Sequence, residues 1–137
     1  MQTTFTILKP DSIKDGNAGA IISRLEKEGF RILGMKMVQL TKPQAEGFYA
    51  VHKDRPFFSS LIAFMTEGPV IMMVLEGDAA IDKLRKLMGS TDPAKADAGT
   101  IRKQFAANIE RNAMHGSDSQ DTAAFEISYF FSQLEMV

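Results

Sequence analysis

The sequence contains no cysteine and only two histidines among its 137 residues. The lack of cysteine excludes disulfides, thiolate zinc sites and a cysteine nucleophile. Two histidines also argue against a histidine-rich metal site. The net charge is −1, so no overall positive field draws the chain to nucleic acid or to a membrane surface. A site for an anion would therefore have to be built from a few converging cations.

Long hydrophobic runs are missing as well. The longest, residues 70–75, is far too short to span a bilayer. The first residues show no basic segment followed by an apolar stretch. We therefore expect a cytoplasmic protein with no membrane partner. The length and the ordinary apolar and charged content suit one domain over residues 1–137.

Alternation, helical spacing and turn signals divide the chain into strands and helices. Strand patterns occur at residues 2–8, 30–40, 70–75 and 112–115. Helical patterns follow Asn17, the Thr41-Lys42-Pro43-Gln44 capping box, Pro56, Asp78 and Ser119. The resulting order is β-α-β, two helices, β-α-β. It predicts an α+β, ferredoxin-like (split βαβ) four-stranded antiparallel sheet covered by helices, with an inserted helical hairpin. A parallel α/β sheet is the weaker alternative, because too few strands alternate with helices.

Two local expectations concern the core and a helix start. In the second strand Leu33, Met35 and Met37 fall on one face of an ideal strand, and we expect the methionines to fill the core. Asp78 stands where it would cap the helix that follows the third strand.

The stretch Asn112-Ala113-Met114-His115-Gly116-Ser117-Asp118-Ser119 is poorly suited to a core. Its histidine stands before a glycine, which permits close approach of a ligand or backbone. Serine and aspartate favour helix N-termini, and helix N-termini attract anions. The pattern predicts that His115 faces an anion in a cleft.

Three roles are open to His115. A core histidine would not need the polar residues that follow it in the sequence. A metal ligand would need partners that this chain lacks. A nucleophile or general base needs an orienting carboxylate, and Glu126 can reach back from the last helix. Ser117 as the nucleophile is less suitable, because the Gly-x-Ser-x-Gly elbow is absent and the spacing from His115 is poor.

A neutral imidazole is an effective nucleophile near pH 7, so His115 suits phosphoryl transfer. The transferred group carries charge on its equatorial oxygens, and cations must surround it. Lys9, Arg55, Arg85 and Arg102 are spread over the sequence, several of them at the ends of predicted elements. Converging cations have this distribution, although scattered surface charges would have it too.

The stretch around His115 resembles the Asn-x-x-His-Gly-Ser-Asp-Ser signature of nucleoside diphosphate kinases, and the resemblance covers nearly the whole chain. The other matching blocks are Lys9-Pro10-Asp11, Asp54-Arg55-Pro56-Phe57-Phe58, Gly68-Pro69-Val70, Gly89-Ser90-Thr91-Asp92-Pro93 and Gly99-Thr100-Ile101-Arg102. The resemblance implies a ping-pong transfer of the γ-phosphate from a nucleoside triphosphate, typically ATP, to a nucleoside diphosphate through a phosphohistidine at His115.

The resemblance also implies a role for each further site residue. The phosphates would be held by Lys9, Arg85, Thr91 and Arg102, and the sugar would meet Lys9 and Asn112. The base would stack on Phe57 beside Leu61, which accepts any base because every base has a π-face. Support and orientation of His115 would come from Tyr49, Ser117 and Glu126.

Mg²⁺ would be carried on the nucleotide phosphates, with no direct protein ligand. Members of the family form homodimers that build tetramers or hexamers, and the resemblance does not decide between the two assemblies.

Two other functions fit a sheet of this kind. A nucleic-acid-binding module would need exposed aromatic residues on the central strands and a basic face, whereas these strands carry mainly aliphatic residues and methionine. A phosphatase of related fold would pass the phosphoryl group to water.

Overall fold

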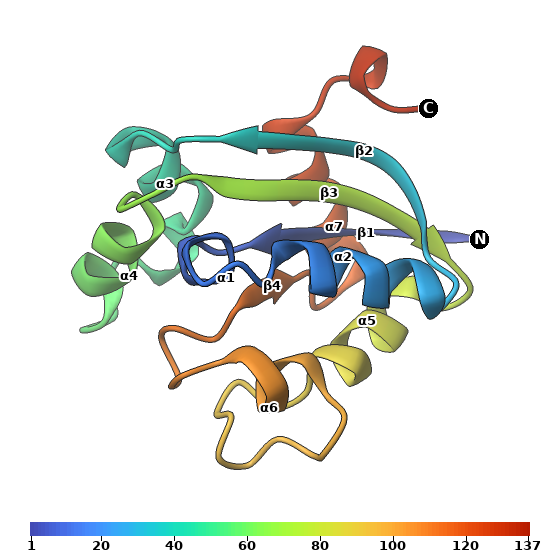
Figure 1. Ribbon diagram of the computed structural model, residues 1–137. Coiled ribbons are helices and arrows are strands. Elements are labelled where there is room, and N and C mark those ends of the chain that lie inside the picture. The colour runs from blue at the N-terminus through green and yellow to red at the C-terminus, as the bar shows by residue number, and fades with distance from the viewer.

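The computed structural model describes residues 1–137 and contains one four-stranded antiparallel sheet. Its strands are β1 (Gln2–Leu8), β2 (Arg31–Val38), β3 (Val70–Gly77) and β4 (Met114–Gly116). They lie in the order β2-β3-β1-β4, so the first and third strands occupy the centre (Figure 1). This is the ferredoxin-like α+β arrangement that the sequence predicted.

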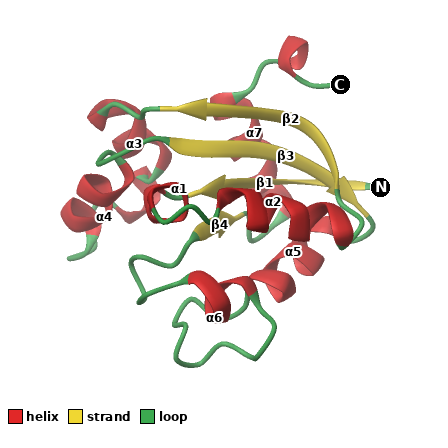
Figure 2. Cartoon of the chain, viewed as in Figure 1, coloured by secondary structure: helices red, strands yellow, loops and turns green.

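Helices cover both faces of the sheet (Figure 2). Those packed on one face include α2 (Ala18–Lys27), α5 (Ala80–Met88) and α6 (Ile101–Phe105). Those packed on the other are α3 (Lys42–Phe48), α4 (Phe58–Met65) and α7 (Gln120–Phe130). The short elements are α1 (Pro10–Lys14) and the 3₁₀ turns η1 (Ala50–His52) and η2 (Gln133–Glu135).

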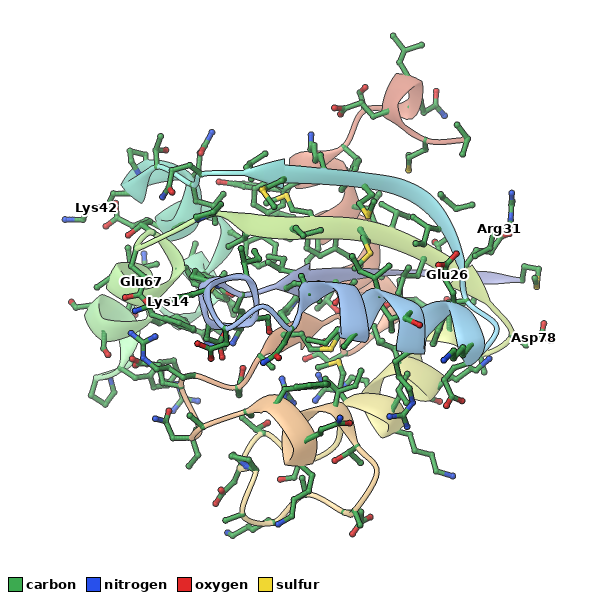
Figure 3. The ribbon with its side chains drawn as sticks, viewed as in Figure 1. Lys14, Glu26, Arg31, Lys42, Glu67 and Asp78 are labelled. Carbon is green, nitrogen blue, oxygen red and sulfur yellow. The ribbon has the colours of Figure 1, made fainter.

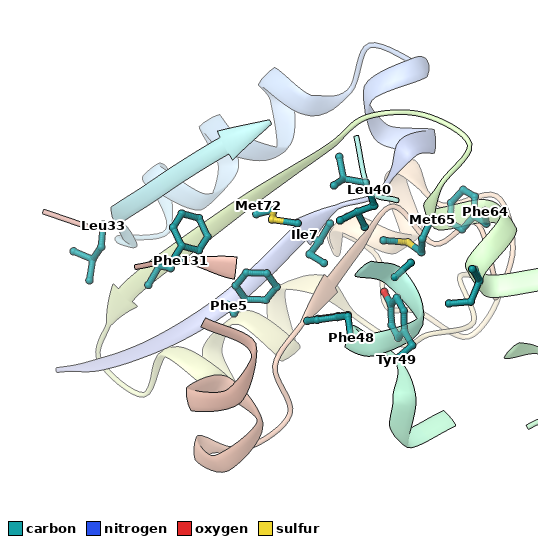
Figure 4. Close-up of a cluster of buried hydrophobic side chains, with 14 residues drawn as sticks. Phe5, Ile7, Leu33, Leu40, Phe48, Tyr49, Phe64, Met65, Met72 and Phe131 are labelled. Carbon is teal, nitrogen blue, oxygen red and sulfur yellow. The ribbon is translucent and has the colours of Figure 1, made fainter. Parts of the chain in front are cut away.

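The strands β1 and β3 separate two hydrophobic clusters because successive side chains point to opposite faces. Phe5 and Ile7 enter the cluster beneath α3, α4 and α7, together with Phe48, Met72 and others (Figure 4). Leu8 and its neighbours on the other face pack against α2 and α5. The two inner strands are thereby buried on both sides.

The expected core position of Met35 and Met37 is wrong. The register of β2 against β3 shifts between Ile32 and Gly34, where Leu33 is the extra residue of a bulge. Leu33 therefore packs in the aromatic cluster, whereas Met35 and Met37 point to the opposite face. They are 53% and 57% exposed and lie on a strand that pairs on one side only.

The N-termini of α3 and α7 have the caps that the sequence predicted, whereas that of α5 does not. The Thr41–Gln44 capping box is present at α3, and Ser119 caps α7 in the same reciprocal way with Thr122. Asp78 does not cap α5, because Ala79 occupies the N-cap and the side chain of Gln2 accepts from the backbone N–H of Ile81. The short helix α1, which begins at Pro10, was not expected from the sequence.

Most charged side chains lie on the periphery of the molecule, whereas Lys9, Asp11 and Arg102 are buried. Figure 3 shows Lys42 and Glu67 at the end formed by α3 and α4, and Arg31 and Asp78 at the opposite end. None of the helices combines the length and the apolar character that crossing a membrane requires.

Candidate active site

The short edge strand β4 carries His115 and lies beside the end of β1. Ile7 pairs with His115 and Leu8 with Met114. The hydroxyl of Thr6 donates to the carbonyl of His115 over 2.6 Å, which fixes the strand further. Because paired residues point to the same face of a sheet, the imidazole projects toward the aromatic cluster that contains Ile7.

The imidazole of His115 is held by a carboxylate. Its Nε2 lies 2.9 Å from Oε1 of Glu126 in α7, and the hydroxyl of Ser117 donates to the same oxygen over 2.7 Å. Ser117 is itself fixed to β1, since the backbone N–H of Phe5 donates to its Oγ and its own N–H donates to the carbonyl of Phe5. With Nε2 engaged by the carboxylate, Nδ1 is the ring nitrogen left without a protein partner.

Aromatic rings surround the imidazole on the side of the core. The ring of Phe48 lies edge-on with its centroid 5.5 Å from that of His115, and the ring of Tyr49 follows at 6.5 Å. The phenol of Tyr49 is buried and its oxygen has no hydrogen-bond partner. Burial, with a contribution from the charge of Glu126, raises the pKa of Tyr49. Tyr49 therefore keeps its proton.

A hydrogen bond joins helix α7 to helix α3. The hydroxyl of Tyr129 in α7 donates to the carbonyl of Gln44 in α3 over 2.8 Å. Gly47 leaves the space for this tyrosine, since a side chain there would collide with its oxygen. The helix that carries Glu126 is thus joined to the helix that ends just before Tyr49.

Lys9 stands at the end of β1 and is buried. Its Nζ donates to Oδ1 of Asn112 over 2.7 Å, and the amide of Asn112 donates to the carbonyl of Ile109. Burial, reinforced by the positive charge of Arg102, lowers the pKa of Lys9 from 10.5 to about 8. A buried ammonium with one neutral partner is suited to receive an anion.

Two arginines complete a cluster of cations around β4. Arg102 donates to the carbonyls of Gly89, Asn112 and Met114, and Arg85 donates to that of Gly116. Burial and the neighbouring Arg85 lower the pKa of Arg102 to about 10. Three of the four cations that the sequence analysis named therefore converge. The fourth, Arg55, is exposed in the turn before α4, and its side chain forms no hydrogen bond or ion pair.

Gly116 has a structural role that differs from the one expected. A Cβ at this position would lie 2.6 Å from Sδ of Met88 and 3.1 Å from Leu84. The missing side chain lets α5 approach β4, and this brings Arg85 to the carbonyl of Gly116. The glycine thus accommodates a helix of the protein itself.

Thr91 and the two predicted base-binding residues, Phe57 and Leu61, form no hydrogen bond with His115 or with the cations around β4. Thr91 is exposed in the loop after α5, two residues from Gly89, whose carbonyl binds Arg102. Phe57 at the start of α4 is 46% exposed, as expected for a ring that could stack, and the imidazole of His52 lies 5.7 Å from it. Leu61, one turn further along α4, packs against the aromatic cluster.

The sequence analysis missed Ile109, an exposed apolar residue in the segment between α6 and β4. Ser60 of α4 donates to the carboxylate of the adjacent Glu110 over 2.5 Å, and Arg111 pairs with Glu67. This segment is therefore held beside α4, the helix that Phe57 precedes. A cavity of about 600 Å³ next to it is lined by Ile109 and by the loop that follows Thr91. An isolated apolar residue among polar ones was the only signal for Ile109 in the sequence.

Comparison with known proteins identifies this arrangement. The family model described as nucleoside diphosphate kinase matches residues 2–136. The chain belongs to the nucleoside diphosphate kinase family. The nucleoside diphosphate kinase of Desulfosudis oleivorans is 56% identical over 137 residues, which cover 100% of this chain and 99% of that relative. The relative in Geobacter sulfurreducens is 55% identical, with both chains covered in full.

Solved structures of the family superpose closely on this one. The nucleoside diphosphate kinase of Aquifex aeolicus has a TM-score of 0.97 and 43% identity, with 99% of each chain covered. The enzyme of Halobacterium salinarum, solved in complex with CDP, has a TM-score of 0.96 and 40% identity over 99% of this chain and 91% of that one. Members of the family are phosphotransferases, and nucleoside diphosphate kinase activity is the function that these likenesses support.

Proposed function

We propose that the chain transfers the γ-phosphoryl group of a nucleoside triphosphate to a nucleoside diphosphate through a phosphohistidine at His115. The observation that carries this proposal is the contact of Glu126 with Nε2, which leaves Nδ1 of His115 as the free nucleophile. The family match makes nucleotides the substrates. We propose that the whole chain, residues 1–137, acts as one domain in the cytoplasm.

In the first half-reaction the Nδ1 lone pair attacks the γ-phosphorus, and the bond from phosphorus to the bridging oxygen breaks. The diphosphate leaves with the electrons of that bond. The imidazole gains positive charge as the P–N bond forms, and the carboxylate of Glu126 stabilises it. In the second half-reaction a terminal oxygen of the acceptor diphosphate attacks the phosphorus, the P–N bond breaks and Nδ1 recovers its lone pair.

The cations supply the electrostatic stabilisation of the transferred group. Lys9, Arg85 and Arg102 would bind the phosphate oxygens, with Thr91 contributing its hydroxyl from the adjacent loop. Lys9 and Asn112, already joined by a hydrogen bond, would also meet the sugar hydroxyls. The unpartnered hydroxyl of Tyr49 would orient the imidazole or the phosphoryl group.

The base would stack on the exposed ring of Phe57, with Leu61 beside it. We add Ile109 as a second apolar contact for the base, because its segment is tied to α4 through Ser60 and Glu110. Contacts of this kind recognise a flat ring rather than its edge, so they favour broad acceptance of bases.

Mg²⁺ fits this site only as a companion of the nucleotide. No group of three or more histidine, aspartate or glutamate side chains could hold a metal ion, and the cations around β4 would repel a bare one. Bound to the nucleotide phosphates, Mg²⁺ would neutralise charge on them. Chelation of Mg²⁺ is expected to slow the transfer from ATP while leaving the fold and its melting temperature unchanged.

A homo-oligomer is the second part of the proposal. The outer edge of β2 is unpaired by another strand, and Met35 and Met37 are exposed beside it. An uncovered apolar edge strand invites pairing with another chain, and a second copy would cover it. Dimers formed in this way would assemble further into a tetramer or a hexamer.

The nucleic-acid-binding alternative loses its main support. Both faces of the sheet bury hydrophobic clusters under helices, so neither is free to stack bases. The phosphatase alternative is tested directly by the experiment that tests the kinase.

The test is an incubation of the protein with ATP labelled at the γ-phosphate, with and without GDP. We expect an acid-labile, base-stable label on the protein in the absence of GDP and labelled GTP in its presence. His115→Ala should abolish both. Label that persists in His115→Ala would refute His115 as the nucleophile, and release of phosphate faster than formation of GTP would identify a phosphatase.

A further inference from the structure

Ala113, two residues before His115, has a backbone conformation that alanine seldom adopts. Its φ is +77°, in the left-handed half of conformational space that favours glycine. The N–H of Met114 donates to the carbonyl of Asn112 over 3.0 Å, which makes Ala113 the centre of a three-residue turn. Such a γ-turn with positive φ is rare and strained, so its surroundings must hold it in place.

Three contacts hold Ala113, and all come from residues 9–12. The N–H of Lys9 and the hydroxyl of Ser12 both donate to the carbonyl of Ala113, over 3.0 and 2.7 Å. The N–H of Ala113 donates to Oδ2 of Asp11 over 3.0 Å. Asp11, Ser12 and Ala113 are all buried. The first turn of α1 thus satisfies both polar groups of the strained residue.

The turn at Ala113 also sets the directions of the groups on either side of it. The carbonyls of Asn112 and Met114 both accept hydrogen bonds from Arg102, over 3.3 and 2.9 Å. The side chain of Asn112 meets Lys9. If Ala113 relaxed to negative φ, one of these carbonyls would turn away from Arg102, and β4 with His115 would shift relative to the cations.

Besides its hydrogen bond to Ala113, the carboxylate of Asp11 acts through its charge on the buried ammonium of Lys9, whose pKa it raises. It forms no ion pair, and its second oxygen is buried without a partner. Burial raises the pKa of this carboxyl, so its position costs the fold solvation energy. The hydrogen bond from Ala113 and the attraction of the Lys9 charge offset part of that cost.

We propose that Asp11, assisted by Ser12, is a positioning residue that holds the strained turn at Ala113 and thereby aligns Arg102, Asn112 and His115 for phosphoryl transfer. The inference rests on the proposed function, which supplies the reaction for which these groups are aligned. The side chain of Asp11 forms no hydrogen bond with His115 and acts on it through Ala113.

The primary test is Asp11→Ala, measured as the single-turnover rate at which His115 is phosphorylated by ATP. The variant leaves the N–H of Ala113 without its acceptor and lets the turn relax. We expect the rate to fall about 10- to 100-fold, the range that release of one strained residue corresponds to. The dissociation constant of ADP should also rise, because Arg102 and Asn112 would bind the nucleotide, while the number of ADP sites per chain stays at the wild-type value. Asp15→Ala is the matched control, because Asp15 is an exposed aspartate at the other end of α1, and its rate should equal that of the wild type.

A second variant separates positioning from a general loss of structure. Glycine adopts positive φ without strain. In a chain that carries Ala113→Gly, the turn therefore depends less on its hydrogen bonds with Asp11 and Ser12. Adding Asp11→Ala to that chain should reduce the rate by a much smaller factor than it does alone. If Asp11→Ala acted only by unfolding part of the protein, the number of ADP sites and the transfer rate would both fall in proportion to the unfolded fraction.

The inference is wrong if folded Asp11→Ala transfers at the wild-type rate, or if Ala113→Gly gives no rescue. Should Asp11→Ala fail to fold, Ser12→Ala takes its place, with a smaller expected loss. If neither the wild type nor Asp15→Ala acquires a phosphoryl group, the proposed function has failed. NMR couplings that report the φ of Ala113 then still test whether Asp11 holds the turn. An unchanged positive φ in Asp11→Ala would show that it does not.

Discussion

One oxygen of Glu126 contacts both Nε2 of His115 and the hydroxyl of Ser117. The carboxylate therefore fixes the ring and compensates the charge that develops on it during transfer. Glu126→Gln keeps the shape but removes the charge. We expect the rate of His115 phosphorylation to fall about 10- to 100-fold, since a hydrogen bond to a charged group is stronger than a neutral one by a comparable factor. Single-turnover labelling with ATP measures it.

Asp121→Asn is the control for this variant, because Asp121 is an exposed carboxylate in the first turn of the same helix. Its labelling rate should stay at the wild-type value. An unchanged rate in Glu126→Gln would mean that the carboxylate contributes neither charge nor orientation.

The lowered pKa of Lys9 predicts how activity depends on pH. The ammonium is charged below its pKa of about 8 and neutral above it, so the phosphate-binding charge is lost as the pH rises. We expect kcat/KM, which reports the free enzyme, to fall by about tenfold per pH unit above that value. A steady-state pH profile with GDP as acceptor measures this limb.

Lys9→Arg provides the comparison, because a guanidinium stays charged across this range. The alkaline limb should disappear in this variant even if the activity at neutral pH is lower. A limb that remains in Lys9→Arg would assign the titration to another group.

At the scale of residues, the sequence predicted the chemistry better than the geometry. The position of His115 before small polar residues was readable as a feature of a site, whereas the roles of Lys9, Phe57 and Glu126 became specific only through the resemblance. The roles of Tyr49 and Thr91 came from the resemblance alone, since neither stands in a distinctive pattern. The strain at Ala113 was unreadable, because nothing about an alanine indicates positive φ and the hydrogen bonds that hold it come from residues about a hundred positions away.

At the scale of elements, the contact of α5 with β4 depends on the missing side chain of Gly116. Gly116→Ala would place a methyl group 2.6 Å from Sδ of the buried Met88. Overpacking of this kind costs about 1–3 kcal/mol in the free energy of unfolding. It should also loosen the contact of Arg85 with β4 and raise the KM for nucleotide. Urea denaturation and steady-state kinetics measure the two effects.

Met88→Ala in the Gly116→Ala chain restores space at the contact. It should recover part of the nucleotide KM, although the truncated methionine lowers stability on its own account. No recovery of KM in the double variant would show that crowding against α5 is not the cause.

Element boundaries followed the sequence where local signals decided them. The capping boxes of α3 and α7 are examples, because each involves residues within one turn. The start of α5 was mispredicted because its cap comes from Gln2, which is distant in sequence. The bulge at Leu33 was also unreadable, since it arises from pairing with β3 and inverts the expected faces of Met35 and Met37.

At the scale of the whole molecule, the uncovered edge of β2 bears on assembly. The pair Met35→Lys and Met37→Lys would place two charges in the proposed contact between copies. We expect the variant to dissociate at protein concentrations at which the wild type stays associated, because burying two unpaired charges is costly. Light scattering after size-exclusion chromatography over a dilution series measures the mass.

Val51→Lys is the control for this variant, because Val51 is an exposed apolar residue of η1, away from β2. Its mass should follow that of the wild type. An unchanged mass in the methionine variant would place the contact between copies elsewhere. The overall fold, in contrast to the assembly, was predictable, because the order of strands and helices restricts the topology to very few solutions.

Because of the bulge at Leu33, the methionines of β2 are exposed to oxidants in solution whereas those of β3 are not. Met72 and Met73 on the neighbouring strand are fully buried, whereas Met35 and Met37 are open. A peroxide would convert the open thioethers to sulfoxides first and make the edge of β2 polar. With no cysteine to compete for the oxidant, the order in which methionines gain oxygen in a mass spectrum records how far β2 is covered in solution.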